Sequence, residues 1–149
     1  MNAHNLLSVI NCVGDLALVF LAWSRRGRSV IATPMLVLFL AMFAWGFADL
    51  QHELFAVGRL PAHVLASFLP ALSLQVVVVF VGKARSSRRR MQLAYAATLL
   101  VALSAPWTEP WWQLLLGLAA VLMGYSVVLL LEHRRRAFDV EERARADLI

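Results

Sequence analysis

The chain has 149 residues, of which 61% are hydrophobic and 15% charged, and its formal net charge is +5. A globular domain carries about 25% charged residues, so this chain has more apolar surface than a soluble fold of its length can bury. The composition excludes an ordinary soluble domain and indicates an integral membrane protein. The positive charge then lies beside the membrane and faces anionic lipid, so it does not indicate a nucleic-acid partner.

Five apolar segments approach the roughly 20 residues that a membrane-crossing helix needs. In chain order they cover residues 5–23, 30–50, 62–82, 91–107 and 111–132, and the fourth is the shortest. The connections are short, so consecutive helices should be antiparallel neighbours. The sequence predicts an all-α, polytopic bundle of five transmembrane helices over residues 1–132, followed by a basic cytoplasmic helical extension or tail over 133–149.

The basic residues are distributed unevenly among the loops. Thirteen of the fourteen Lys and Arg residues follow the first, third or fifth apolar segment, and only Arg59 lies in the other set of loops. Cytoplasmic segments keep Lys and Arg because such segments resist translocation. The asymmetry predicts a multi-pass membrane protein with its N-terminus outside and its C-terminus in the cytoplasm.

Polar residues form a stripe on the first segment. His4, Ser8, Asn11 and Asp15 follow each other at spacings of four, three and four residues, which places them on one helical face. Asp15 lies near mid-membrane, where an ionisable side chain should face the bundle interior and find a partner. The candidate partners at similar depth are Gln75, Thr98, Tyr125 and Ser126. Two interpretations stay open, namely structural hydrogen bonding by a protonated Asp15 or a proton, ion or ligand site.

A second polar group gathers where the second and third segments meet the outer surface. Asp49, His52 and Glu53 share a face if the second helix extends that far, and His63 lies at the start of the third segment. Imidazole and carboxylate groups suit zinc, copper or iron, or a pH sensor. His52, Glu53 and His63 are therefore metal candidates, beside the plainer interpretation of ordinary interfacial polar residues.

Small residues recur along the fifth segment. Gly117, Ala120 and Gly124 are spaced three and four residues apart, so they form a stripe that should allow close helix contact.

Acidic and basic residues alternate after the fifth segment. Three acid-to-Arg pairs at i and i+4, which begin at Glu132, Asp139 and Glu141, each favour a helix by a few tenths of a kcal/mol. The fifth helix should therefore continue or restart beyond the membrane. Phe138, Val140 and Leu148 are candidate contacts with a second chain or a downstream domain. The alternative is a solvated basic tail held near anionic lipid.

Several familiar catalytic patterns are missing from the sequence. It contains no Gly-rich phosphate loop, no Gly-x-Ser-x-Gly and no His-Glu-x-x-His. Cys12 is the only cysteine, so an internal disulfide and a Cys-based metal cluster are both excluded. We therefore expect no enzymatic activity from this chain alone, and the sequence names no cofactor.

The chain resembles the amino-terminal, multi-helix membrane sensor module of bacterial sensor histidine kinases. The resemblance rests on Trp23-Ser-Arg-Arg-Gly-Arg28, Met42-Phe-Ala-Trp-Gly-Phe47, Phe68-Leu-Pro-Ala-Leu72, Val79-Phe-Val-Gly-Lys83, Leu93-Ala-Tyr-Ala96 and Glu141-Glu-Arg-Ala-Arg145. It spans nearly the whole chain and implies a signalling role in the bacterial inner membrane, without catalytic residues in the membrane part. Such modules continue into dimerisation and ATP-binding domains, which the 149 residues do not contain.

The leading functional hypothesis is a signalling input module that passes a membrane or outer-face cue through the extension of the fifth helix. The first alternative is a small accessory subunit of a respiratory, photosynthetic or transport complex. The second is a small proton-linked carrier that uses Asp15. The expected partners are the lipid bilayer and another membrane or cytoplasmic protein, with a second copy of the chain among the candidates.

Overall fold

The computed structural model describes residues 3–55, 58–106 and 111–146, and the side chains in those ranges except at 3–5, 53 and 137–146. The described residues form five helices: α1 (Ala3–Ser24), α2 (Ala32–Phe55), α3 (Leu60–Phe80), α4 (Arg88–Ser104) and α5 (Trp111–Ala146). Each predicted apolar segment corresponds to one helix. The all-α class and the order of the helices are therefore confirmed.

Four of the helices are long and apolar enough to cross a membrane. These spans cover Leu6–Ser24, Ala32–His52, Leu60–Phe80 and Trp111–Arg136. The remaining helix, α4, has 17 residues and begins with three arginines. Its length of about 25 Å is a few Å less than the hydrocarbon core of a typical bilayer. The structure thus supports a membrane protein with four apolar helices of spanning length.

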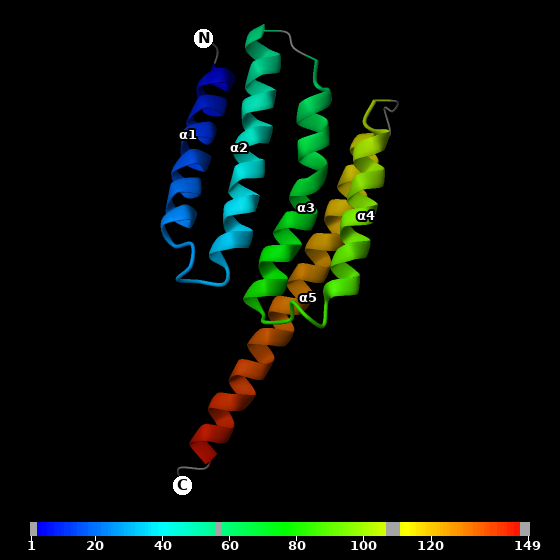
Figure 1. Ribbon diagram of the computed structural model, residues 1–149. Coiled ribbons are helices and arrows are strands. Elements are labelled where there is room, and N and C mark those ends of the chain that lie inside the picture. The colour runs from blue at the N-terminus through cyan, green and yellow to red at the C-terminus, as the bar shows by residue number, and fades with distance from the viewer. Residues whose placement is uncertain (1–2, 56–57, 107–110, 147–149) are drawn as a thin grey trace.

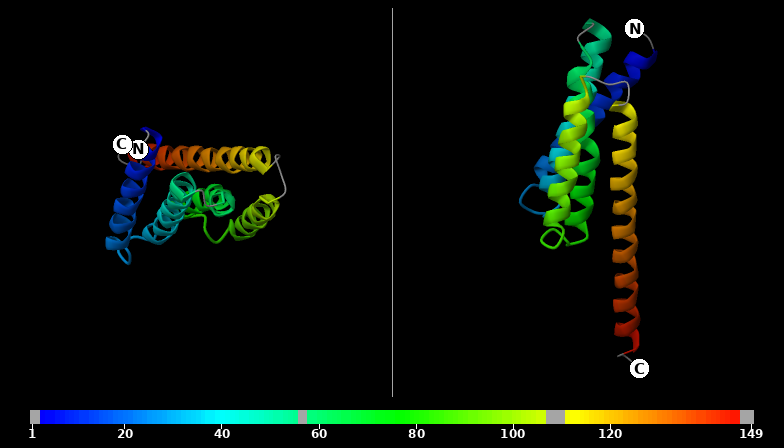
Figure 2. Two further views of the ribbon diagram at one scale, coloured as in Figure 1. Left: turned by 90° about the horizontal axis from the view of Figure 1, so that it is seen from above. Right: turned by 90° about the vertical axis from the view of Figure 1, so that its right-hand side faces the viewer.

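Consecutive helices run in opposite directions, as the short connections predict. Figure 1 shows α1 to α4 following one another across the molecule, while α5 returns behind α3 and α4. Contacts between helices agree, since among the described residues α1 packs only on α2, whereas α3 contacts α2, α4 and α5. The second half of α5 projects well beyond the ends of the other helices, as both side views show (Figures 1 and 2).

The buried core lies where α3, α4 and α5 meet. Its main cluster comprises Ala71, Leu74, Val78, Ala94, Leu122 and Leu129. Alanine on α3 and α4 lets the helix backbones approach closely, and leucines of α5 fill the space between them. A smaller cluster joins Ala66 of α3 to Trp111 and Leu115 at the start of α5. The core therefore fixes α5 along its first half.

The antiparallel arrangement brings the three basic clusters to one end of the bundle (Figure 1). This basic end comprises the α1–α2 turn with Arg25, Arg26 and Arg28, the α3–α4 turn with Lys83 and Arg85, the first α4 residues Arg88–Arg90, and Arg134–Arg136 of α5. Both turns contain a glycine with positive φ, Gly27 at 88° and Gly82 at 71°. Residues with a Cβ rarely adopt this conformation, so glycine permits the chain to reverse sharply there.

The small-residue stripe on α5 does not have the predicted role within this chain. Gly117, Ala120 and Gly124 are all exposed. A Cβ added at either glycine would meet nothing within 4 Å. The prediction of close helix contact is therefore wrong for the helices of this chain, because α5 uses its opposite, leucine-rich face to pack on α3 and α4.

Candidate functional site

The polar stripe of α1 lines a groove against α2. Ser8, Asn11 and Asp15 line it from α1, and Trp45 and Asp49 line it from α2, around a volume of about 660 Å³. Asp15 and Ser8 are partly buried, while Asn11 is exposed. The side chain of His4 lies outside the described residues. Three of the four residues of the predicted stripe therefore share one groove.

The predicted partners of Asp15 are wrong. Because α1 packs on no helix except α2 in the part of the chain that the structure describes, Asp15 does not meet Gln75 on α3 or Tyr125 on α5. Hydropathy identifies helices without ordering them in space, and this bundle places α1 at its edge. The acidic side chain that shares the groove with Asp15 is Asp49 of α2.

Gln75 and Tyr125 instead hold neighbouring helices together. The Tyr95 hydroxyl of α4 donates a hydrogen bond to Oε1 of Gln75 on α3. Nη1 of Arg90 donates to the Tyr125 hydroxyl at 2.6 Å, and the Arg90 guanidinium carbon lies 5.7 Å from the centre of the same ring. These contacts tie α4 to α3 in the core and to α5 near the basic end.

The other two residues at similar depth do not contact Asp15 either. The Ser126 hydroxyl donates to the Leu122 carbonyl of its own helix at 2.9 Å. Thr98 is fully buried on α4. Its hydroxyl has no hydrogen-bond partner among the described residues.

A second groove of about 540 Å³ lies at the end opposite the basic end, between α2, α3 and α5. Its polar lining consists of Asp49, Arg59 and His63, and its aromatic lining includes Trp111. Trp111 is 4% exposed, stacks on His63 with 4.1 Å between ring centres, and donates from Nε1 to the Ser67 hydroxyl at 3.3 Å. The first residue of α5 is therefore anchored in this groove by stacking and a hydrogen bond.

Two of the three predicted metal ligands make other contacts in the structure. α2 continues to Phe55, so His52 lies on the helix as the metal hypothesis requires. Nε of Arg59 donates to Nε2 of His52 at 2.7 Å, while His63 stacks on Trp111. The described residues contain no group of three His, Cys, Asp or Glu side chains placed to hold a metal ion. The side chain of Glu53 lies outside the described residues.

At the basic end, two contacts hold α5 where it leaves the bundle. Lys83, in the turn before α4, forms an ion pair with Glu132. The Phe80 ring meets the His133 ring edge-on at 5.8 Å. Sequence reasoning missed both contacts. The sequence pattern pairs Glu132 with Arg136 on the same helix, and it does not indicate Lys83 or Phe80 as a neighbour.

α5 continues as one helix past the predicted end of its span to Ala146. The proposed contact residues Phe138 and Val140 lie on this stretch of helix, but their side chains are outside the described residues. Leu148 lies beyond the described chain.

Comparison of the chain with protein-family models, with curated proteins and with solved structures finds no match.

Proposed function

We propose that this protein is a non-catalytic signalling input module of the bacterial inner membrane, in which α5 carries a change in the bundle to the cytoplasm. The supporting observation is that α5 is a single helix of 36 residues from Trp111 to Ala146. It is anchored at its start by Trp111 and held at Glu132, and it then continues for about 20 Å. A displacement at one end of a continuous helix moves the other end.

In the proposed topology all five helices cross the membrane, with the N-terminus outside and the C-terminus in the cytoplasm. α3 ends at the basic end and α5 starts at the opposite end, so the chain between them has to return across the bundle (Figure 1). α4 is the helix that makes this return, and its arginines at Arg88–Arg90 extend it into the headgroup region.

Cysteine labelling tests the orientation. In a Cys12→Ala background, Asn2→Cys should react with a membrane-impermeant maleimide in intact cells, and Asp147→Cys should react only after the cells are lysed. Labelling of Asp147→Cys in intact cells would show that the C-terminus lies outside, which would contradict both the proposed orientation and the cytoplasmic role of α5.

The groove around Trp111 is the proposed position of the cue. A small polar or aromatic molecule there would contact α2, α3 and α5 together, because Asp49, His63 and Trp111 come from these three helices. Binding changes the balance between two bundle arrangements only if the molecule has different affinities for them. In this proposal the two arrangements differ in how Trp111, the first residue of α5, packs in the groove, so the molecule binds one arrangement more tightly than the other.

Coupling between the two ends of α5 is the decisive test. Spin labels at Ala84→Cys and Arg136→Cys, in the Cys12→Ala background, report the distance between the α3–α4 turn and α5 by pulsed electron paramagnetic resonance. Trp111→Phe removes the hydrogen bond to Ser67 at the far end and should shift this distance distribution in lipid nanodiscs. Trp112→Phe is the control, since Trp112 is 55% exposed. An unchanged distribution for Trp111→Phe would refute transmission through α5.

A second candidate is an accessory subunit of a larger membrane complex, and the exposed stripe of Gly117, Ala120 and Gly124 favours it. Small residues on an outward helix face allow another helix to approach closely. Copper-catalysed cross-linking of Ala120→Cys in native membranes distinguishes the partners. A disulfide-linked homodimer indicates a second copy, and a cross-link to one unrelated membrane chain indicates a subunit of a complex.

A further inference from the structure

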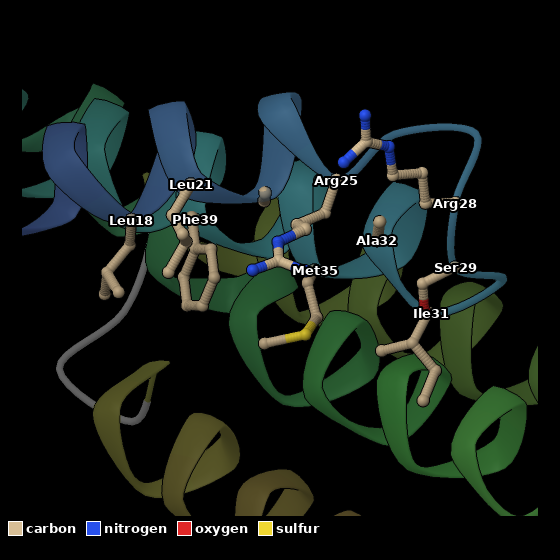
Figure 3. Close-up of a pocket in the computed structure, with 10 residues that line it drawn as sticks. Leu18, Leu21, Arg25, Arg28, Ser29, Ile31, Ala32, Met35 and Phe39 are labelled. Atoms are coloured by element: carbon tan, nitrogen blue, oxygen red, sulfur yellow. The ribbon is translucent and has the colours of Figure 1, made fainter.

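A cavity of about 420 Å³ lies between α1 and α2 at the basic end. Figure 3 shows its lining side chains, with apolar groups such as Leu18, Leu21 and Phe39 at one side and Arg25, Arg28 and Ser29 at the other. Both helices that form the cavity are of membrane-spanning length, and residues of the turn between them line the cavity at the basic end. Apolar and cationic chemistry therefore meet in one cavity at the edge of the membrane.

The tight turn determines which arginines line the cavity. The backbone N–H of Arg28 donates to the Arg25 carbonyl at 3.0 Å, and Gly27 has a φ of 88°. Arg25 and Arg28 line the cavity, as Figure 3 shows. Arg26 does not line it, because its guanidinium lies over the Trp23 ring at 4.5 Å from the ring centre. Two of the three arginines in this turn are thus placed at the cavity.

The cavity has a positive potential that its own lining does not compensate. None of the residues that line it is acidic. α2 begins at Ala32, which also lines the cavity, so the positive end of the α2 dipole adds to the two guanidinium groups. A phosphate group is well matched to two arginines, because each guanidinium presents a fork of N–H donors to its oxygens.

We propose that this cavity binds an anionic phospholipid, with its phosphate between Arg25 and Arg28 and the first part of an acyl chain along Leu18, Leu21 and Phe39. A free phosphate ion would satisfy the arginines but would leave the apolar side of the cavity uncovered. A phospholipid covers both sides, and basic pockets between transmembrane helices on the cytoplasmic side bind such headgroups. This site is independent of the signalling role, because it concerns α1 and α2 and not α5.

Native mass spectrometry of the purified, delipidated protein tests the proposal. The probes are dioleoylphosphatidylglycerol and dioleoylphosphatidylcholine, with inorganic phosphate and glycerophosphoglycerol as competitors. The proposal expects phosphatidylglycerol to bind and phosphatidylcholine not to bind at the same concentration. Loss of one guanidinium in Arg25→Gln or Arg28→Gln should weaken phosphatidylglycerol binding about tenfold. Neither competitor should displace the lipid at equal concentration.

Arg26→Gln is the matched control, because it removes one positive charge from the same turn without altering the cavity lining. It should leave the affinity for phosphatidylglycerol within about twofold of the unchanged protein. An equal loss of affinity for phosphatidylglycerol in Arg26→Gln and Arg28→Gln would show that the lipid is attracted by the basic charge of the turn in general. This result would refute the proposed site. Displacement of the lipid by inorganic phosphate alone would refute the assignment of a phospholipid as the ligand and would indicate an anion site. Helix content by circular dichroism verifies that each variant is folded.

Discussion

Lys83 and Glu132 form an ion pair that joins the α3–α4 turn to α5 at the point where α5 leaves the bundle. Their side chains are 24% and 48% exposed. An ion pair with this much exposure contributes little to the stability of the fold, because water and salt screen it. We expect its main effect to be on the direction of the projecting part of α5.

The first prediction separates that positional role from stability. Glu132→Gln should change the free energy of unfolding only slightly. It should nevertheless broaden the distance distribution between spin labels at Ala84→Cys and Arg136→Cys, because α5 loses its attachment to the turn. High salt should also broaden this distance distribution in the protein that keeps Glu132, because salt screens the ion pair. An equally narrow distribution in Glu132→Gln would show that the ion pair does not direct α5.

The second prediction concerns the hydrogen bond between Tyr95 and Gln75. Tyr95→Phe removes the donor and leaves a partly buried amide oxygen without its partner, so the bundle should lose about 0.6 to 1.5 kcal/mol. Unfolding in mixed detergent micelles measures this loss. Gln75→Leu should lower the free energy of unfolding less in the Tyr95→Phe background than in the protein that keeps Tyr95. Strictly additive losses from the two substitutions would contradict a direct hydrogen bond.

The third prediction follows from the buried hydroxyl of Thr98. Burial of a hydroxyl without a hydrogen bond costs roughly 1 to 3 kcal/mol. Thr98→Val keeps nearly the same shape and removes the polar atom, so it should raise the midpoint of thermal unfolding in detergent. Thr98→Ala removes the methyl group as well as the hydroxyl, so it should raise the midpoint of thermal unfolding less than Thr98→Val does, or lower it. A large destabilisation by Thr98→Val would reveal a partner for the hydroxyl.

The fourth prediction contrasts two adjacent tryptophans. Trp111→Ala removes a buried ring, its stacking on His63 and its hydrogen bond to Ser67, and should destabilise the bundle by about 3 kcal/mol. Trp112→Ala should cost about 1 kcal/mol or less, because Trp112 is 55% exposed. Tryptophan fluorescence should agree, since only Trp111→Ala removes an emitter that is shielded from aqueous quenchers.

The positions of the helices could be predicted from hydropathy, because a membrane demands long apolar segments whatever their neighbours are. The predicted segments 62–82 and 91–107 differ from α3 and α4 by only two or three residues at each end. The basic clusters also fall at one end, as alternation of direction requires. These features depend on local composition and connection length alone.

Helix neighbours could not be predicted in the same way. Nothing in the sequence of α1 states that it packs on α2 alone, so the pairing of Asp15 with Gln75 failed. The stripe at Gly117 and Gly124 has the composition of a contact face, yet α5 packs through Leu122 and Leu129 on its other side. The choice between two acceptable faces depends on the summed packing of the whole bundle.

The order of contacts between helices has a consequence for how the protein is made. Among the described residues, α3 with α5 is the only contact between helices that are not consecutive in sequence. Each earlier contact can form as soon as the next helix leaves the ribosome and enters the bilayer, since it closes only one short connection. Synthesis of α5 then completes the core, so a chain arrested before Leu115 should hold α3 and α4 as a hairpin open to proteolysis and membrane quality control.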